Sequence, residues 1–69
     1  MNRIREYRKR NGWTIKILAD KAGLAAPTVF YAEQEIHHTN VYSAIRLAHA
    51  LGCTLNDLYP EGGEKRGEG

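Results

Sequence analysis

The sequence predicts an all-α fold, a compact five-helix bundle that forms a single domain. Apolar residues recur at intervals of three and four positions, as they do on a helix that lays one face on a core. Gly12, Gly23 and Gly52 each follow one of these runs, where a residue able to adopt positive φ commonly ends a helix. A chain of 69 residues lies near the lower limit for a domain that folds unaided, so its length leaves no room for a second domain.

The first predicted helix lies within residues 2–11. Ile4 and Tyr7 stand three positions apart among charged residues, which is the stripe of a short amphipathic helix, and Gly12 is expected to end it. The stretch is also basic, since the first ten residues contain five Arg or Lys and one Glu, a net charge of +4. Such a cluster is typical of an element that faces phosphate, although the solvated face of a short helix has the same pattern.

Two short helices follow, separated by only a few residues. In the run TIKILADKAG, the Thr14 hydroxyl can cap free backbone amides and Gly23 can end the helix. The core face of this helix consists of Leu18, Ala19 and Ala22. Pro27 fits the first turn of the next helix, where its missing N–H costs nothing. The third helix continues through Val29, Ala32 and Glu33.

A fourth and a fifth helix are predicted closer to the C-terminus. Asn40 is expected to cap the fourth helix and Gly52 to end it. Its broad apolar stripe, expected to lie in the core, consists of Val41, Ala44, Ile45, Leu47, Ala48 and Leu51. Thr54 and Asp57 form a capping pattern for a short final helix before Pro60. That helix offers the core a lid made of Leu55, Leu58 and Tyr59.

The folded domain is expected to span residues 1–60. Residues 61–69 are rich in glycine and charge and contain no apolar residue, so burial cannot offset the entropy of ordering them, and a disordered C-terminal tail is predicted. No stretch approaches the roughly 20 apolar residues of a membrane span, and the charged N-terminus is unlike a secretory signal. Cys53 is the single cysteine, which excludes a disulfide within the chain and suits a reducing compartment. A cytoplasmic location is therefore predicted.

The spacing of the second and third helices is that of a helix-turn-helix. From Ile4 to Tyr59, without an insertion, the sequence resembles the Xre family, which includes the lambdoid phage repressor and Cro-like domains. The residues that carry the resemblance are Gly12, Thr14, Leu18, Ala19, Gly23, Val29, Glu33 and the run LAHALGCTLNDLY from Leu47 to Tyr59. The resemblance implies a lambda repressor-like bundle that binds double-stranded DNA, with the second helix crossing the DNA backbone and the third entering the major groove.

The resemblance also implies a base-contacting face on the third helix. This face consists of Ala26, Pro27, Thr28, Phe30 and Tyr31. The family usually has Gln, Arg, Ser or Asn at several of these positions, whereas here only Thr28 and Tyr31 can hydrogen-bond a base edge. Apolar contacts to thymine methyl groups remain, which favours an A·T-biased readout. The alternative is that this apolar face binds another protein, as in an antirepressor or an adaptor.

A second set of residues is predicted to contact DNA phosphate. The set is Arg8, Arg10, Lys16, His37, His38, Thr39 and Asn40. Lys16 takes this role because Ile15 stands where the family commonly has a phosphate-binding Gln. Glu33 is expected to pair with Arg8, as the family pairs the third helix with the first, and thereby to position Arg8. The loop from His37 to Asn40 lacks the family's usual glycine, and an exposed loop without a ligand is the alternative interpretation.

No catalytic site, metal site or cofactor is predicted. His37 and His38 are adjacent, but His49 is isolated from them and no carboxylate lies at a useful interval, so the ligands are too few for a metal. No nucleophile has a histidine base at a meaningful interval, and no glycine-rich phosphate loop follows a strand. Cys53 stands where the family usually has a small apolar residue, so it is expected to fill space in the core rather than to react.

These observations predict a sequence-specific transcriptional repressor with no small-molecule substrate, and not an enzyme. Because one such domain buries a modest interface with DNA, we expect a homodimer on half-sites about one helical turn apart. In the family arrangement the dimer surface would include Leu55, Leu58 and Tyr59. Ile15 and Ile17 offer another surface, unless one of them packs on the core.

Overall fold

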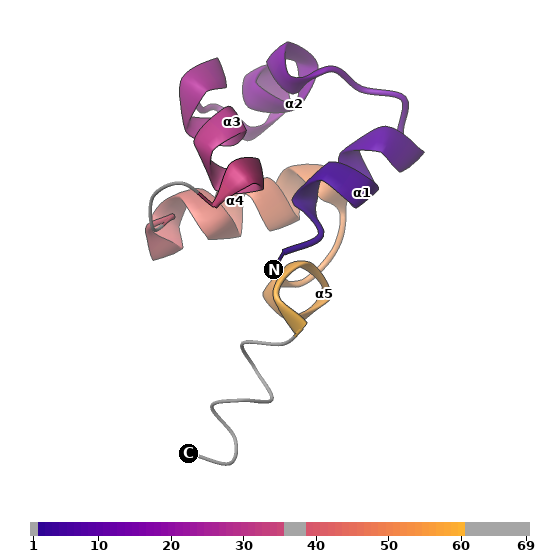
Figure 1. Ribbon diagram of the computed structural model, residues 1–69, viewed down its shortest axis with the longest axis vertical. Coiled ribbons are helices and arrows are strands. Elements are labelled where there is room, and N and C mark those ends of the chain that lie inside the picture. The colour runs from indigo at the N-terminus through magenta and orange to yellow at the C-terminus, as the bar shows by residue number, and fades with distance from the viewer. Residues whose placement is uncertain (1, 36–38, 61–69) are drawn as a thin grey trace.

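The computed structural model describes residues 2–35 and 39–60. These residues form five helices and contain no strand, which confirms the predicted all-α fold. The helices are α1 (Ile4–Arg10), α2 (Ile15–Ala22), α3 (Ala26–Gln34), α4 (Val41–Leu51) and α5 (Leu55–Leu58). α2 and α3 lie together on one side of α1 and α4, and α5 lies on the opposite side (Figure 1). The tail predicted for residues 61–69 lies outside the described residues.

Polar side chains begin two of the longer helices at the predicted positions. The Thr14 hydroxyl accepts a hydrogen bond from the backbone N–H of Ile17 at 3.2 Å, and the Asn40 amide oxygen accepts one from Ser43 at 2.8 Å. Each bond satisfies one of the amides that a helix leaves unpaired in its first turn. Both helices end on the predicted glycine in the left-handed region.

Each helix contributes one fully buried side chain to a single core. These side chains are Ile4, Leu18, Val29, Leu47 and Leu58, all 0% exposed. Burial of a large aliphatic side chain contributes about 1.5–3 kcal/mol. Because α2 packs against both α3 and α4, this one cluster fixes the relative positions of the two helices of the helix-turn-helix.

The predicted core stripe of α4 is only partly buried. Val41 is 68% exposed and Ile45 is 50% exposed, and the prediction was wrong for these two residues. The reason is that the neighbouring helices cover one side of α4, whereas Val41 and Ile45 lie one turn apart on its other side. Tyr42, 65% exposed, is next to Val41, so the open side of α4 is markedly apolar.

α5 begins with a capping box. The Thr54 backbone N–H donates to the Asp57 carboxylate at 2.9 Å, and the Asp57 N–H donates to the Thr54 hydroxyl at 3.1 Å. The hydrogen bond from the Thr54 backbone, followed by the contact with its side chain, lowers the pKa of Asp57 below its ordinary value of 3.8. The box therefore makes a small part of the stability depend on pH.

The sign of that dependence follows from the direction of the pKa change. A carboxyl whose pKa falls on folding stabilises the folded state above its ordinary pKa, and the contribution is lost as pH falls through the folded value. Asp57→Asn is therefore expected to be slightly less stable than the wild type at pH 7, with the difference disappearing below pH 3.8. Urea denaturation at a series of pH values measures it, and Asn56→Ala, at the exposed neighbouring position, is the control. A difference that is the same at pH 7 and pH 3 would contradict the assignment.

Candidate nucleic-acid interface

α2, a tight turn and α3 form the predicted helix-turn-helix. Residues 23–25 connect the two helices. Gly23 has a φ of 71°, and the N–H of Leu24 donates to the carbonyl of Ala19 at 2.9 Å, which closes the end of α2. Pro27 lies in the first turn of α3, where its ring is pre-organised for a helix. The turn thus sets the angle at which α3 leaves α2.

The outer side of α3 is open to solvent and carries the residues predicted to contact bases. Phe30 and Tyr31 are each 42% exposed, and their rings meet edge to face with centroids 5.8 Å apart. Pro27 is also exposed, whereas Ala26 and Thr28 are half-buried. The predicted face is therefore accessible along most of its length, and two aromatic rings dominate its surface.

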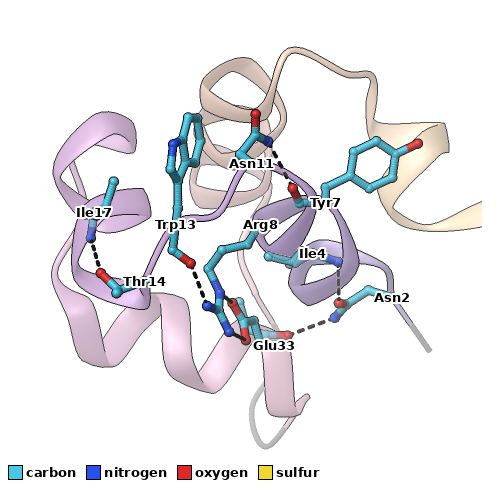
Figure 2. A network of polar contacts seen from close by, with 10 residues as sticks. Asn2, Ile4, Tyr7, Arg8, Asn11, Trp13, Thr14, Ile17 and Glu33 are labelled. Atoms are coloured by element: carbon cyan, nitrogen blue, oxygen red, sulfur yellow. Dashed lines mark hydrogen bonds and ion pairs between the residues drawn. The ribbon is translucent and has the colours of Figure 1, made fainter.

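An ion pair ties α3 to α1 (Figure 2). Arg8 Nε donates to Glu33 Oε2 at 2.6 Å and Arg8 Nη2 donates to Glu33 Oε1 at 3.1 Å, so the pair is bidentate. Arg8 Nη1 donates to the carbonyl of Trp13 at 2.9 Å, in the segment that leads into α2. The Arg8 and Glu33 side chains are 11% and 1% exposed. The predicted partners are thus in contact, and they brace α1, the start of α2 and α3 against one another.

The Arg8 guanidinium, which is also predicted to contact phosphate, is mostly engaged within the protein. Three nitrogens of its guanidinium donate within the protein, and little of the side chain reaches the surface. A guanidinium has five N–H donors, so one N–H on Nη1 and one on Nη2 remain that could donate to a phosphate while the pair with Glu33 is kept. Arg8 therefore positions α3 through Glu33, and the phosphate contact predicted for Arg8 stays a prediction.

A second link, which we did not predict from the sequence, holds the C-terminal end of α3. The Asn2 side-chain amide donates to the carbonyl of Ala32 at 2.8 Å, and the Asn2 backbone N–H donates to the Glu35 carboxylate. Glu35 adopts a φ of 57°, in a left-handed position that usually favours glycine. Locally, the Asn2 side chain accepts a bond from the Ile4 N–H two residues on at 3.1 Å, which is an Asx turn before the helix. Ala32 and Glu35 are 30 and 33 positions away from Asn2, and no local sequence pattern predicts that Asn2 contacts them.

Arg10 and Lys16, both predicted to contact phosphate, are exposed. The Arg10 guanidinium donates to Glu6 at 2.9 Å and lies 4.6 Å from the centre of the Tyr7 ring. Lys16 Nζ lies 3.6 Å from the Asp20 carboxylate, and its side chain is 79% exposed. Exposed ion pairs of this kind contribute little to stability. Either cation can therefore exchange its carboxylate for a phosphate at low cost.

The predicted phosphate-binding loop is described only in part. His37 and His38 lie outside the described residues. Thr39 is half-buried, and Asn40 is exposed. The amide oxygen of Asn40 caps α4, so its NH₂ is the side-chain group left to donate to a phosphate.

The same described residues contain neither a metal-binding cluster nor a membrane-spanning helix. Within 2–35 and 39–60, no three His, Cys, Asp or Glu side chains gather where they could hold a metal ion. Over those same ranges, none of the helices combines the length and apolar character needed to cross a membrane. Cys53 is half-buried against the core, and this burial raises the pKa of its thiol. A higher pKa keeps the thiol protonated and less reactive.

An exposed helix set on a tight turn and braced by a buried ion pair defines a helix-turn-helix domain. The chain belongs to the helix-turn-helix family, which matches residues 4–58, and this confirms the resemblance found in the sequence. It is similar to a protein of Archaeoglobus fulgidus named as an uncharacterized HTH-type transcriptional regulator. The two are 30% identical over 57 residues, which cover 83% of this chain and 81% of that protein. No solved structure matches the chain.

Proposed function

We propose that this chain is a transcriptional repressor that binds double-stranded DNA and reads the major groove with α3. The observation that carries the proposal is the exposed outer side of α3 on a braced helix-turn-helix. Membership of the helix-turn-helix family, and a relative named as a transcriptional regulator, support a DNA-binding regulator rather than an enzyme. The resemblance to phage repressors is what favours repression over activation.

In this proposal, base contact and phosphate contact come from different residues. Phe30 and Tyr31 would pack against thymine methyl groups, with Thr28 and the Tyr31 hydroxyl as the groups able to hydrogen-bond base edges. Arg10, Lys16 and the residues from His37 to Asn40 would contact phosphate and set the register. Arg8 would hold α3 at the angle that both sets of contacts require.

Salt dependence of DNA binding tests the proposal. The tightest-binding duplex is first selected from a random pool, and its affinity is then measured by fluorescence anisotropy at several salt concentrations. Lys16→Ala and Arg10→Ala are each expected to reduce the slope of log K against log salt by about 1, because each removes one phosphate contact. Tyr31→Ala is expected to weaken the selected site roughly tenfold and leave the slope unchanged, because it removes base contact alone.

Lys21→Ala is the matched control for Lys16→Ala. Both lysines are exposed on α2, but Lys21 is at the end of the helix away from the predicted phosphate contacts, so its loss should not change the slope. Equal slopes for Lys16→Ala and Lys21→Ala, or no duplex binding even at low salt, would contradict the proposal.

A second candidate function uses the same face of α3. The exposed aromatic pair Phe30 and Tyr31 would suit a protein partner as well as a DNA groove. A chain that binds no duplex but keeps a protein partner through these two residues would have that function.

We further propose a homodimer in the cytoplasm, with residues 1–60 as the DNA-binding domain. Of the residues predicted for the dimer surface, Leu58 is fully buried within the monomer and Tyr59 is half-buried, so only Leu55, 38% exposed, offers much area there. Ile17 is 39% exposed, whereas Ile15 packs partly on the core. An interface built on Leu55 alone would be small.

A further inference from the structure

A hollow with a volume of about 620 Å³ lies between the end of α2 and the open side of α4. It is here called the α2–α4 hollow. Its apolar lining consists of Ala22, Ile45 and Ala50, with Tyr42 beside them. Its other lining residues are Lys21, Arg46 and His49. None of the lining residues comes from α3, so this surface is distinct from the proposed DNA-reading face.

Arg46 is held rigidly at the edge of the hollow. Its Nε donates to the carbonyl of Ala22 at 2.7 Å, and its Nη1 donates to the Tyr42 hydroxyl at 2.8 Å. The guanidinium also lies 5.2 Å from the centre of the Tyr42 ring. A cation fixed in this way loses little conformational entropy when it binds an anion.

The positive charge of the hollow has no acidic counterpart. Elsewhere in the described part of the chain, four basic residues form ion pairs with carboxylates: Arg3, Arg8, Arg10 and Lys16. Within that same part, neither Arg46 nor Lys21 has a carboxylate within 4.0 Å, and none of the seven lining residues is acidic. α4 as a whole carries no Asp or Glu. The hollow therefore combines an apolar lining, of which Ile45 is the exposed member, with uncompensated positive charge.

Two occupants from the same chain fit this combination poorly. Residues 61–69 contain carboxylates but no apolar residue to cover Ile45. A second copy packed about a two-fold axis would bring the same surface patch, and therefore the same cations, against itself. Like charges placed together in an interface are unfavourable.

We propose that the α2–α4 hollow binds an acidic amphipathic segment of a partner protein. One apolar side chain of that segment would pack on Ala22, Ile45 and Ala50, and flanking carboxylates would pair with Arg46 and Lys21. This is the helix-in-groove mode of recognition, with charge complementarity setting the choice of partner.

The test uses the full 69-residue chain and a synthetic helical peptide of about 14 residues with Leu at every fourth position and Glu beside each Leu. Backbone amide NMR shifts of the labelled protein are followed as peptide is added. We expect the shifts to cluster at Lys21, Ala22, Ile45, Arg46, His49 and Ala50. A matched peptide with Gln in place of Glu should bind about tenfold more weakly, because it cannot form charge-assisted hydrogen bonds.

Exposed positions supply variants that keep the fold. Ile45→Ser and Lys21→Gln are each expected to weaken binding of the acidic peptide severalfold. Leu55→Ser, at an exposed apolar position on α5, should not change that binding. Circular dichroism checks that each variant is folded, and duplex binding measured in parallel shows whether the α3 face is intact.

Three results would overturn the proposal. The acidic and Gln peptides could bind equally, or duplex DNA could shift the same residues at low salt in place of the peptide. The same residues could also shift with protein concentration alone, which would make a second copy the occupant.

Discussion

Arg8→Met is expected to lower the free energy of unfolding by about 3–5 kcal/mol, because it leaves the buried Glu33 carboxylate without its partner. The Glu33 side chain is 1% exposed, so water cannot replace the guanidinium unless the site opens. The Trp13 carbonyl loses its donor in the same variant. A single hydrophobic core in a chain of this size rarely contributes more than about 3–5 kcal/mol, so a large fraction of the chain should unfold at 37 °C. Urea denaturation followed by circular dichroism measures the loss.

Two further variants show whether the loss of stability comes from the unpaired buried carboxylate or from removing any arginine. Arg8→Met combined with Glu33→Leu removes both charges, and this double variant should recover most of the stability. Arg3→Met removes an arginine from an ion pair of similar length that is exposed, at 3.0 Å from Glu6, and should change stability little. If Arg8→Met and Arg3→Met behave alike, the brace between α1 and α3 is not what holds α3 in place.

The ends of the helices could be predicted because their signals are local. A capping side chain and the amide it accepts from are three residues apart, as with Thr14 and Asn40, and a left-handed glycine ends a helix wherever it occurs. The pair formed by Arg8 and Glu33 is 25 residues apart and was predicted only through the family resemblance. Local sequence signals alone would not have predicted the contact between these two residues.

The exposed side of α4 shows where the sequence pattern was insufficient. Its apolar residues extend around more of the helix than one core can cover, and the pattern does not say which of them the neighbouring helices reach. Val41 and Ile45 were left outside because α2 and α5 pack on the other side of α4. The same applies to Arg46, whose bond to the Ala22 carbonyl joins residues 24 positions apart.

Gly23 lies beside the hydrogen bond between Arg46 and the Ala22 carbonyl. Gly23→Ala is expected to lower the free energy of unfolding by about 2–3 kcal/mol. An alanine at a φ of 71° is strained by about 1–2 kcal/mol. A Cβ atom there would also lie 2.4 Å from Arg46 Nη2, so the guanidinium must move. Moving it breaks the 2.7 Å hydrogen bond from Arg46 to Ala22 and costs about 1 kcal/mol more.

Gly52 separates the backbone strain at positive φ from the steric clash with Arg46, because it has the first without the second. It has a φ of 70° at the end of α4, and a Cβ there would meet nothing within 4 Å, so Gly52→Ala should cost the strain alone, about 1–2 kcal/mol. In an Arg46→Ala background the extra cost at Gly23 should vanish, because no guanidinium remains to be displaced. Urea denaturation of Gly23→Ala, Gly52→Ala, Arg46→Ala and the double variant Gly23→Ala with Arg46→Ala measures the coupling between Gly23 and Arg46. Equal costs at Gly23 and Gly52 in the wild-type background would show that Arg46 does not secure the turn between α2 and α3, and that the turn depends on its own backbone conformation alone.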